Sequence, residues 1–239
     1  MHREHVRWFS PALEREMDLL VFGHAGARAL VFPSSMGRFF EWEDQGMTSA
    51  LGEQLERGWL QLYCVDSVDA ESWYAKWKHP ADRARYHARY DRYLHDEVLP
   101  LTRHRNPDPY LITTGASFGA YHALTFALRH PFEVGRAIGL SGVYDIREIT
   151  DGYSDGEVYP FNAPEFLANE HDPARVAALQ RLDIILAIGH DDRMRGNSEY
   201  FSGKLWERGI GNALRLWDGW AHDWPWWRKM IVTYIGGHD

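Results

Sequence analysis

The sequence predicts an α/β fold in which a mostly parallel central sheet is covered on both faces by helices. Short apolar runs, typical of strands buried on both faces, alternate along the chain with segments of helical spacing. Strands that alternate with helices at this spacing favour parallel pairing, because each parallel connection must cross back over the sheet. With no internal repeat and no linker-like boundary, residues 1–239 are expected to form one domain.

The N-terminal segment differs from the rest of the predicted sheet. Residues 5–22 contain two extended stretches that meet near Ser10-Pro11-Ala12-Leu13. Two such stretches joined by a short turn are typical of an antiparallel hairpin. We therefore expect a hairpin at one edge of the sheet.

The remaining elements follow in order from apolar periodicity and helix-stop signals. Strands are predicted at 29–32, 59–65, 110–113, 136–140, 183–188 and 213–217. Helices are predicted at 47–57, 80–101, 118–130, 173–180, 197–208 and 225–234. The tyrosines of the second helix, with Leu94 and Val98, follow one of its sides, and we interpret this stripe as core.

Residues 143–172 have no clear period and are rich in Asp, Gly, Tyr, Pro and Asn. Irregular segments of this length inside a compact domain are usually functional. We expect a small cap-like insertion or a wall of a pocket here.

Composition excludes several classes of partner. Hydrophobic residues make up 45% of the chain and charged residues 25%, as in globular proteins, and no apolar run could span a bilayer. The formal net charge is −8, with no stretch that concentrates Lys and Arg, which argues against nucleic acid as a partner. Membrane and nucleic-acid binding are therefore not expected, and the sequence leaves the oligomeric state open.

The single cysteine, Cys64, excludes an intrachain disulfide and fits a reducing compartment. The N-terminal residues lack the apolar region of a secretory signal. We expect a cytoplasmic protein in which Cys64 is a small buried residue of a strand.

The sequence Gly115-Ala116-Ser117-Phe118-Gly119 stands where a strand gives way to a helix. A serine at such a sharp turn needs small neighbours, because the strand and the helix pass close together. Its hydroxyl then lies at a helix N-terminus, where backbone N–H groups favour developing negative charge. Ser117 is therefore a candidate nucleophile, with an ordinary helix-capping serine as the alternative.

Further candidate residues follow other predicted strands. His190-Asp191-Asp192 follows the strand at 183–188, and His222 follows the last strand. Ligands of parallel sheets collect at the carboxyl ends of the strands, so these side chains are expected near Ser117. The order serine, acid, histidine is the order of an α/β-hydrolase, in which His222 would take the proton of Ser117 and an aspartate would orient the imidazole.

The residues alone leave Asp191 and Asp192 open as the acid. A metal site built from the same histidines and aspartates is the alternative, but the spacing matches no local metal motif. We therefore expect neither a metal nor an organic cofactor.

The chain resembles a serine esterase family of the α/β-hydrolase superfamily, which includes esterase D-like enzymes, feruloyl esterases and mycolyltransferases. The matching pieces are GASFG at 115–119, the preceding YDRYLHDEVLP, the G-x-x-D at 189–192 and GWAHDWPWW at 219–227. They occur in the expected order between residues 90 and 227. The resemblance implies an α/β-hydrolase fold with a Ser-Asp-His triad.

The resemblance also implies particular roles. It selects Asp192 as the acid, and it places the oxyanion hole on the backbone N–H groups of Phe118 and of a residue in an early loop. That second donor would be Ser35, with Met36 next. The loop reads Pro33-Ser34-Ser35, unlike the H-G-G or D-G-L type loop of relatives.

Other side chains are weaker candidates. Trp220 and Trp224 flank His222 and could face the pocket, and Met36 is a further candidate for substrate contact, although core is the usual place of tryptophan. Asp66 and Asp69 stand at a strand end and are interpreted as residues that cap or turn the loop, with cleft lining as the alternative.

The predicted function is that of a serine carboxylesterase acting on a small-molecule ester through an acyl-enzyme on Ser117. An acyltransferase shares this intermediate and differs in the acceptor that resolves it. A catalytically silent relative that binds an acyl or carbohydrate ligand is the alternative outside enzymes. The sequence identifies neither the acyl group nor the alcohol.

Overall fold

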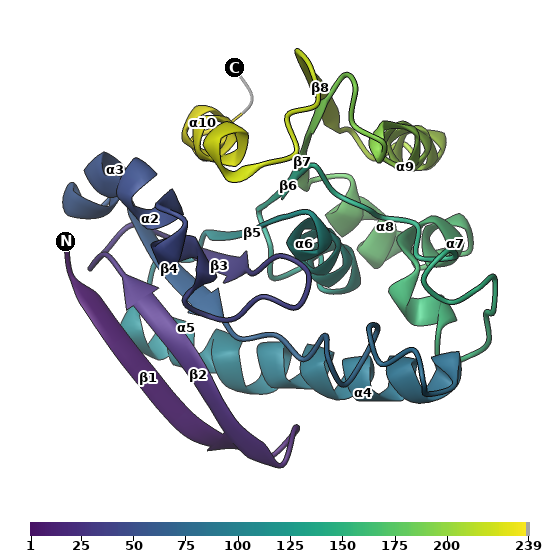
Figure 1. Cartoon of the computed structure of the whole chain (residues 1–239), viewed down its shortest axis with the longest axis horizontal. Coiled ribbons are helices and arrows are strands. Elements are labelled where there is room, and N and C mark those ends of the chain that lie inside the picture. The colour runs from purple at the N-terminus through teal and green to yellow at the C-terminus, as the bar shows by residue number, and fades with distance from the viewer. Residues whose placement is uncertain (238–239) are drawn as a thin grey trace.

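The computed structural model describes residues 1–237, whose strands form one sheet (Figure 1). The strands are β1 (Arg3–Ser10), β2 (Arg15–Phe22), β3 (Ala27–Phe32), β4 (Leu60–Val65), β5 (Leu111–Ala116), β6 (Arg136–Leu140), β7 (Asp183–Gly189) and β8 (Ala213–Trp217). Within the described residues, the sheet has 8 strands in the order β1-β2-β4-β3-β5-β6-β7-β8.

Parallel pairing joins β3 to β4 and runs on through β5, β6, β7 and β8. The hairpin β1–β2 is antiparallel and pairs with β4, also antiparallel, through β2. The predicted mostly parallel sheet with an N-terminal edge hairpin is therefore confirmed. Its parallel part brings the carboxyl ends of β3, β5, β7 and β8 to one edge of the sheet.

Helices cover both faces. They are α1 (Glu41–Asp44), α2 (Met47–Ala50), α3 (Gly52–Glu56), α4 (Pro80–Arg92), the π-helix η1 (Tyr93–Val98), α5 (Leu99–Arg105), α6 (Phe118–Arg129), the 3-10 turn η2 (Tyr159–Phe161), α7 (Ala163–Ala168), α8 (Pro173–Leu179), α9 (Arg195–Glu207) and α10 (Trp224–Tyr234).

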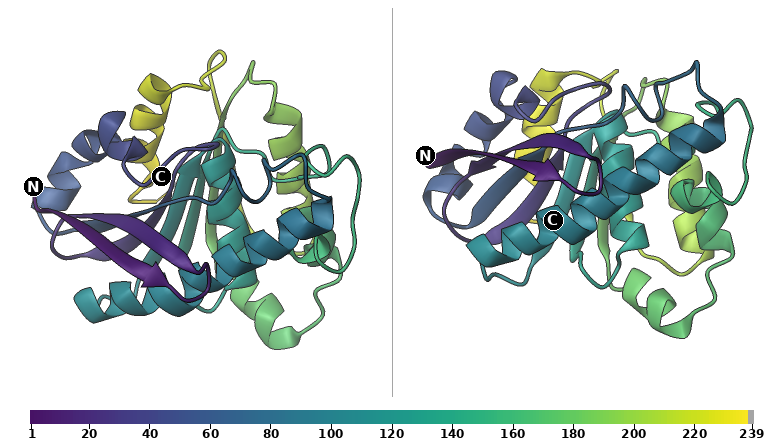
Figure 2. Two further views of the ribbon diagram at one scale, coloured as in Figure 1. Left: turned by 60° about the horizontal axis from the view of Figure 1, so that its bottom comes forward. Right: turned by 90° about the horizontal axis from the view of Figure 1, so that it is seen from below.

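The two faces of the sheet belong to two separate cores. Leu30 of β3 packs in a cluster with residues of α4, α6 and α9, whereas its neighbour Val31 packs in a cluster with residues of α1, α2, α3 and α10. Figure 2 shows α4 across one face, with α10 on the other side of the sheet. Successive residues of a strand point to opposite faces, so a continuous apolar run supplies both cores.

The predicted helix at 80–101 is present, but its middle is a π-helix, η1. Pro100 lies in the first turn of α5, where it has no N–H to donate and its ring meets the carbonyl one turn earlier. A wider preceding turn accommodates such a proline. The predicted core stripe is confirmed at Tyr90, Tyr93, Leu94 and Val98, which are buried.

Two short segments differ from the predicted elements. The helix expected at 47–57 is divided into α2 and α3 by Leu51, which leaves helical geometry at φ −92° and ψ 14°. Residues 143–172, expected to be irregular, contain η2 and α7. Both differences concern pieces of a few residues, where packing outweighs a weak periodicity.

Within residues 1–237, none of the helices combines the length and the apolar character that a membrane crossing requires.

Candidate active site

Ser117 stands between β5 and α6 in a strained backbone conformation, with φ 55° and ψ −118°. Its N–H donates to the carbonyl of Leu140 on β6 at 2.8 Å. A non-glycine residue with positive φ costs about 1–3 kcal/mol and persists where the surroundings enforce it. The sharp strand-to-helix turn predicted from the sequence is therefore present.

Gly115 and Gly119 are required by the close approach of neighbouring backbone. A Cβ on Gly115 would lie 2.4 Å from the carbonyl carbon of Gly119. A Cβ on Gly119 would lie 2.5 Å from the carbonyl oxygen of Pro33. Both contacts are with backbone atoms, which cannot turn aside as a flexible side chain would.

Replacing Gly119 with alanine is therefore expected to lower the free energy of unfolding by about 3 kcal/mol or more, because α6 must move away from the end of β3. Urea denaturation measures this loss. The matched control is Gly203→Ala in α9, where an added Cβ meets nothing within 4 Å. That variant should be neutral or more stable by up to about 1 kcal/mol, since alanine favours a helix. Equal stability of both variants would contradict the steric argument.

His222 follows β8, which β6 and β7 separate from β5 in the sheet, and its side chain reaches Ser117. Its Nε2 lies 3.3 Å from Ser117 Oγ, and its Nδ1 lies 2.7 Å from Asp192 Oδ2. With Nδ1–H donated to a carboxylate, Nε2 carries the lone pair that can accept the serine proton. The three predicted side chains thus form one chain of hydrogen-bond contacts.

Asp192 and Asp191 lie in different surroundings. The Asp192 side chain is 0% exposed, and its Oδ1 accepts the N–H of Met194 at 2.9 Å. Asp191 is exposed and contacts its neighbour His190, with Oδ1 2.9 Å from Nδ1. Of the two aspartates, Asp192 is the one that contacts His222.

The loop after β8 is held against the end of β7. A Cβ on Gly189 would lie 2.1 Å from the carbonyl oxygen of Trp220, so only glycine permits this approach. Ala221 then turns the chain with φ 43°, and the ring of Trp220 stacks on His222 with centroids 5.7 Å apart. The imidazole is thereby fixed by packing as well as by Asp192.

A cavity of about 190 Å³ adjoins Ser117. It is lined by Ser35, Tyr74, Ser117, Phe118, Ser141, Val143, Asp145, Glu148, Ile149, Arg193, Met194 and His222. Four of these residues, Val143, Asp145, Glu148 and Ile149, belong to the segment 143–172. Trp220, Trp224 and Met36 are not among the lining residues.

Two of the lining residues, Ser35 and Phe118, carry the predicted oxyanion donors. Within residues 1–237, neither backbone N–H has a hydrogen-bond acceptor. The N–H of Phe118 also begins α6, where the helix dipole adds to its effect on an anion. The N–H of Met36 donates instead to Asp69 Oδ2 at 3.0 Å.

Several lining residues were not predicted. Tyr74 donates its hydroxyl hydrogen to Ser35 Oγ at 2.7 Å, and burial raises the pKa of this tyrosine, so it stays protonated near neutral pH. Arg193 and Glu148 bring exposed charged groups to the lining. Tyr74 and Glu148 lie on irregular segments and Arg193 follows the predicted acid, so no periodicity pointed to them.

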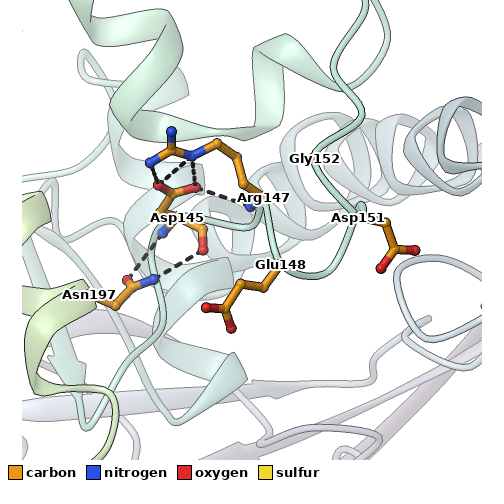
Figure 3. Close-up of a pocket in the computed structure, with 6 residues that line it drawn as sticks. All are labelled: Asp145, Arg147, Glu148, Asp151, Gly152 and Asn197. Atoms are coloured by element: carbon orange, nitrogen blue, oxygen red, sulfur yellow. Dashed lines mark hydrogen bonds and ion pairs between the residues drawn. The ribbon is translucent and has the colours of Figure 1, made fainter.

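A second cavity, of about 530 Å³, is lined by the residues drawn in Figure 3. It shares Asp145 and Glu148 with the cavity at Ser117. Asp145 is paired with Arg147, and its backbone N–H donates to Asn197 Oδ1 at 3.2 Å. Glu148 and Asp151 are drawn in Figure 3 without a partner among the residues shown. Groups too large for the cavity at Ser117 could therefore extend into a space with an acidic lining.

Two further observations concern a possible metal site and the single cysteine. Within residues 1–237, no cluster of three or more His, Cys, Asp and Glu side chains could hold a metal ion. Cys64 is buried in β4, and burial raises the pKa of its thiol well above the usual range, so the thiolate is not available near neutral pH.

Comparison with known proteins gives one family and many similar folds. The family model described as "Putative esterase" matches residues 42–236. No curated protein sequence matches the chain.

Among solved structures, a ferulic acid esterase is 16% identical with a TM-score of 0.76, over 97% of this chain and 95% of that one. The S-formylglutathione hydrolase FrmB from Staphylococcus aureus is 19% identical with a TM-score of 0.67, over 98% and 96%. MPT51 from Mycobacterium tuberculosis is 16% identical with a TM-score of 0.69, over 99% and 97%. At such identities the similarity shows the fold alone.

Proposed function

Because the chain belongs to the "Putative esterase" family, we propose that it is a serine carboxylesterase in which Ser117, His222 and Asp192 form the catalytic triad. The resemblance noted in the sequence and the α/β-hydrolase fold are confirmed by the family match and the similar structures. The protein is thus a serine hydrolase that acts on ester bonds. The residues that perform the reaction and the ester that they cleave are the substance of the proposal.

One observation carries the assignment of residues: the hydrogen-bonded chain from Asp192 through His222 to Ser117, with contacts of 2.7 and 3.3 Å. In the first step His222 Nε2 takes the proton of Ser117 as Oγ bonds to the ester carbonyl carbon. The negative charge on the carbonyl oxygen is stabilised by the N–H groups of Phe118 and Ser35.

The tetrahedral intermediate collapses when the bond from carbon to the alcohol oxygen breaks. His222 returns its proton to that oxygen, the alcohol leaves, and the acyl group remains on Ser117. Water then attacks the acyl carbon while His222 takes its proton. The bond from that carbon to Ser117 Oγ breaks, His222 returns the proton to Oγ, and the carboxylic acid is released. Asp192 keeps the imidazole in the required tautomer and stabilises its charged form throughout.

The dimensions of the site support a compact acyl group. The cavity at Ser117 has about 190 Å³, whereas the neighbouring cavity has about 530 Å³ and an acidic lining. We infer that a short or compact acyl group is bound beside Ser117. A bulky apolar acyl chain would have to displace water from carboxylates, which is unfavourable.

Three measurements test the proposed function. A fluorophosphonate probe should label the folded protein at Ser117, as located by peptide mass analysis, because it reacts with activated serines. Nitrophenyl acetate and butyrate should be hydrolysed faster than nitrophenyl palmitate. Absence of labelling would favour a silent binding protein. If added alcohols became acylated in preference to hydrolysis, the protein would be an acyltransferase.

A further inference from the structure

In the loop between β3 and α1, three neighbouring backbone N–H groups have hydrogen-bond acceptors and one has none. The N–H of Ser34 donates to Glu41 Oε2 at 2.6 Å, that of Met36 to Asp69 Oδ2 at 3.0 Å, and that of Gly37 to the carbonyl of Ser34 at 2.9 Å. Within the described part of the chain, only Ser35 among these residues keeps an N–H without an acceptor. Two carboxylates therefore hold the loop on either side of the proposed oxyanion donor.

Asp69 makes a second contact on the other half of the oxyanion hole. Its Oδ1 lies 2.8 Å from Nε2 of His122, which belongs to α6, the helix that begins with Phe118. Both side chains are buried, at 0% exposure for Asp69 and 1% for His122. One carboxylate thus joins the loop that carries Ser35 to the helix that carries the Phe118 N–H.

The backbone conformation of Met36 and the burial of Asp69 indicate that the contacts of this carboxylate hold the loop in a fixed position. Met36 has φ 60°, a conformation that a residue with a side chain adopts only when its neighbours enforce it. A fully buried carboxylate is also unfavourable unless each of its oxygens is satisfied. Here one oxygen is satisfied by Met36 N–H and the other by His122. Removing either contact therefore frees the loop or leaves an unpaired buried group.

We propose that Asp69 is a positioning residue, which through Met36 and His122 sets the separation of the two oxyanion donors, Ser35 and Phe118. The proposal rests on the proposed esterase function. Donors stabilise an oxyanion only when they lie about 2.7–3.1 Å from its oxygen, so a small shift of the loop weakens binding of the transition state more than binding of the ester. Asp69 touches neither substrate nor Ser117 and acts only through this geometry.

The test compares Asp69→Ala with Asp66→Ala, because asparagine would keep an oxygen that accepts a backbone N–H, whereas alanine removes it. Asp66 is a matched control because it is also buried, follows the same strand and accepts a backbone N–H, that of Phe39 at 3.3 Å. Its charged partner is Arg38, at 2.7 Å, and it contacts neither Met36 nor His122. Asp69→Ala should lower kcat for nitrophenyl acetate about 10- to 100-fold, with KM changed less than about threefold. Asp66→Ala should keep kcat within about threefold of the wild type.

A transition-state analogue separates positioning from general damage. A trifluoromethyl ketone forms a tetrahedral adduct with a serine hydroxyl, and its oxygen occupies the oxyanion hole. Its inhibition constant should rise in Asp69→Ala by the same factor by which kcat/KM falls, and should stay near the wild-type value in Asp66→Ala. Unchanged inhibition and kcat in a folded Asp69→Ala variant, or equal losses in both variants, would overturn the proposal.

Substitutions at His122 keep the test decisive if Asp69→Ala does not fold. His122→Gln retains a donor for Oδ1 of Asp69, whereas His122→Ala leaves that oxygen without one. His122→Ala should reproduce the loss of kcat and the weaker inhibition, and His122→Gln should recover most of both. Equal effects of the two substitutions would count against positioning through Asp69.

Hydrogen exchange distinguishes this proposal from the proposed function. The amide of Met36 should exchange faster in Asp69→Ala than in Asp66→Ala, whatever reaction the protein catalyses. If the wild type neither hydrolysed esters nor reacted with fluorophosphonate, the proposed function would fail, while faster exchange would still support the hold of Asp69 on the loop. An active wild type whose Met36 amide is unaffected by Asp69→Ala would instead show that Asp69 does not hold the loop.

Discussion

Replacing Ser117 with alanine is expected to lower kcat for nitrophenyl acetate by about 10⁴-fold or more. Without Oγ no acyl-enzyme can form, and His222 has no hydroxyl to deprotonate. What remains is the slower attack of water assisted by the oxyanion donors and by substrate binding. Initial rates at saturating ester, corrected for spontaneous hydrolysis, measure the change.

The fold should be unaffected by this substitution. Alanine has the same Cβ as serine and therefore meets the same strain at φ 55°. Ser49→Ala provides a control for surface serines, since Ser49 is an exposed residue of α2 on the opposite face of the sheet from α6. It should hydrolyse the ester at the wild-type rate. Residual activity above a tenth of wild type in a folded Ser117→Ala sample would exclude Ser117 as the nucleophile.

The sequence could predict the sheet and the neighbourhood of Ser117 for a physical reason. Parallel strands bring their carboxyl ends to one edge, so residues that follow β5, β7 and β8 must gather there whatever the details of the helices. The glycines around Ser117 are dictated by backbone contacts that any such turn must make. These constraints are local or topological, and both can be read from the order of residues.

Side chains placed by long-range packing could not be predicted in this way. Asp69 was interpreted as a loop-capping residue, yet it accepts the N–H of Met36 from another loop and pairs with His122 on α6. Tyr74 reaches the cavity because its neighbour Trp73 is buried against Tyr121, with ring centroids 6.3 Å apart. No spacing within the sequence encodes contacts of this kind.

The tryptophans near His222 illustrate the opposite problem. Because they are close to His222 in sequence, they were expected to face the pocket, but the backbone directs their side chains elsewhere. Trp220 stacks on the imidazole, yet 54% of its surface is exposed and it does not line the cavity. Trp224 packs against Trp227, with ring centroids 4.8 Å apart. Ala221, whose φ is 43°, lies between Trp220 and His222 in a turn that the sequence alone does not reveal.

Replacing Asp192 with asparagine is expected to lower kcat by about 10³- to 10⁴-fold, an effect of the size known for the corresponding change in a well-studied serine protease. The asparagine amide would donate to Nδ1 of His222 and so favour the tautomer with hydrogen on Nε2. That tautomer cannot accept the proton of Ser117. The asparagine oxygen can still accept the N–H of Met194, so the turn should survive.

Asp191→Asn is the matched control, because it makes the same chemical change one residue earlier. Its carboxylate is exposed and contacts only His190 among the described side chains, so kcat should stay within about twofold of the wild type. The ratio of the two kcat values, measured with both variants shown to be folded by circular dichroism, decides between the acids. A similar modest loss in both would mean that neither aspartate orients His222, whereas a large loss confined to Asp191→Asn would transfer that role to Asp191.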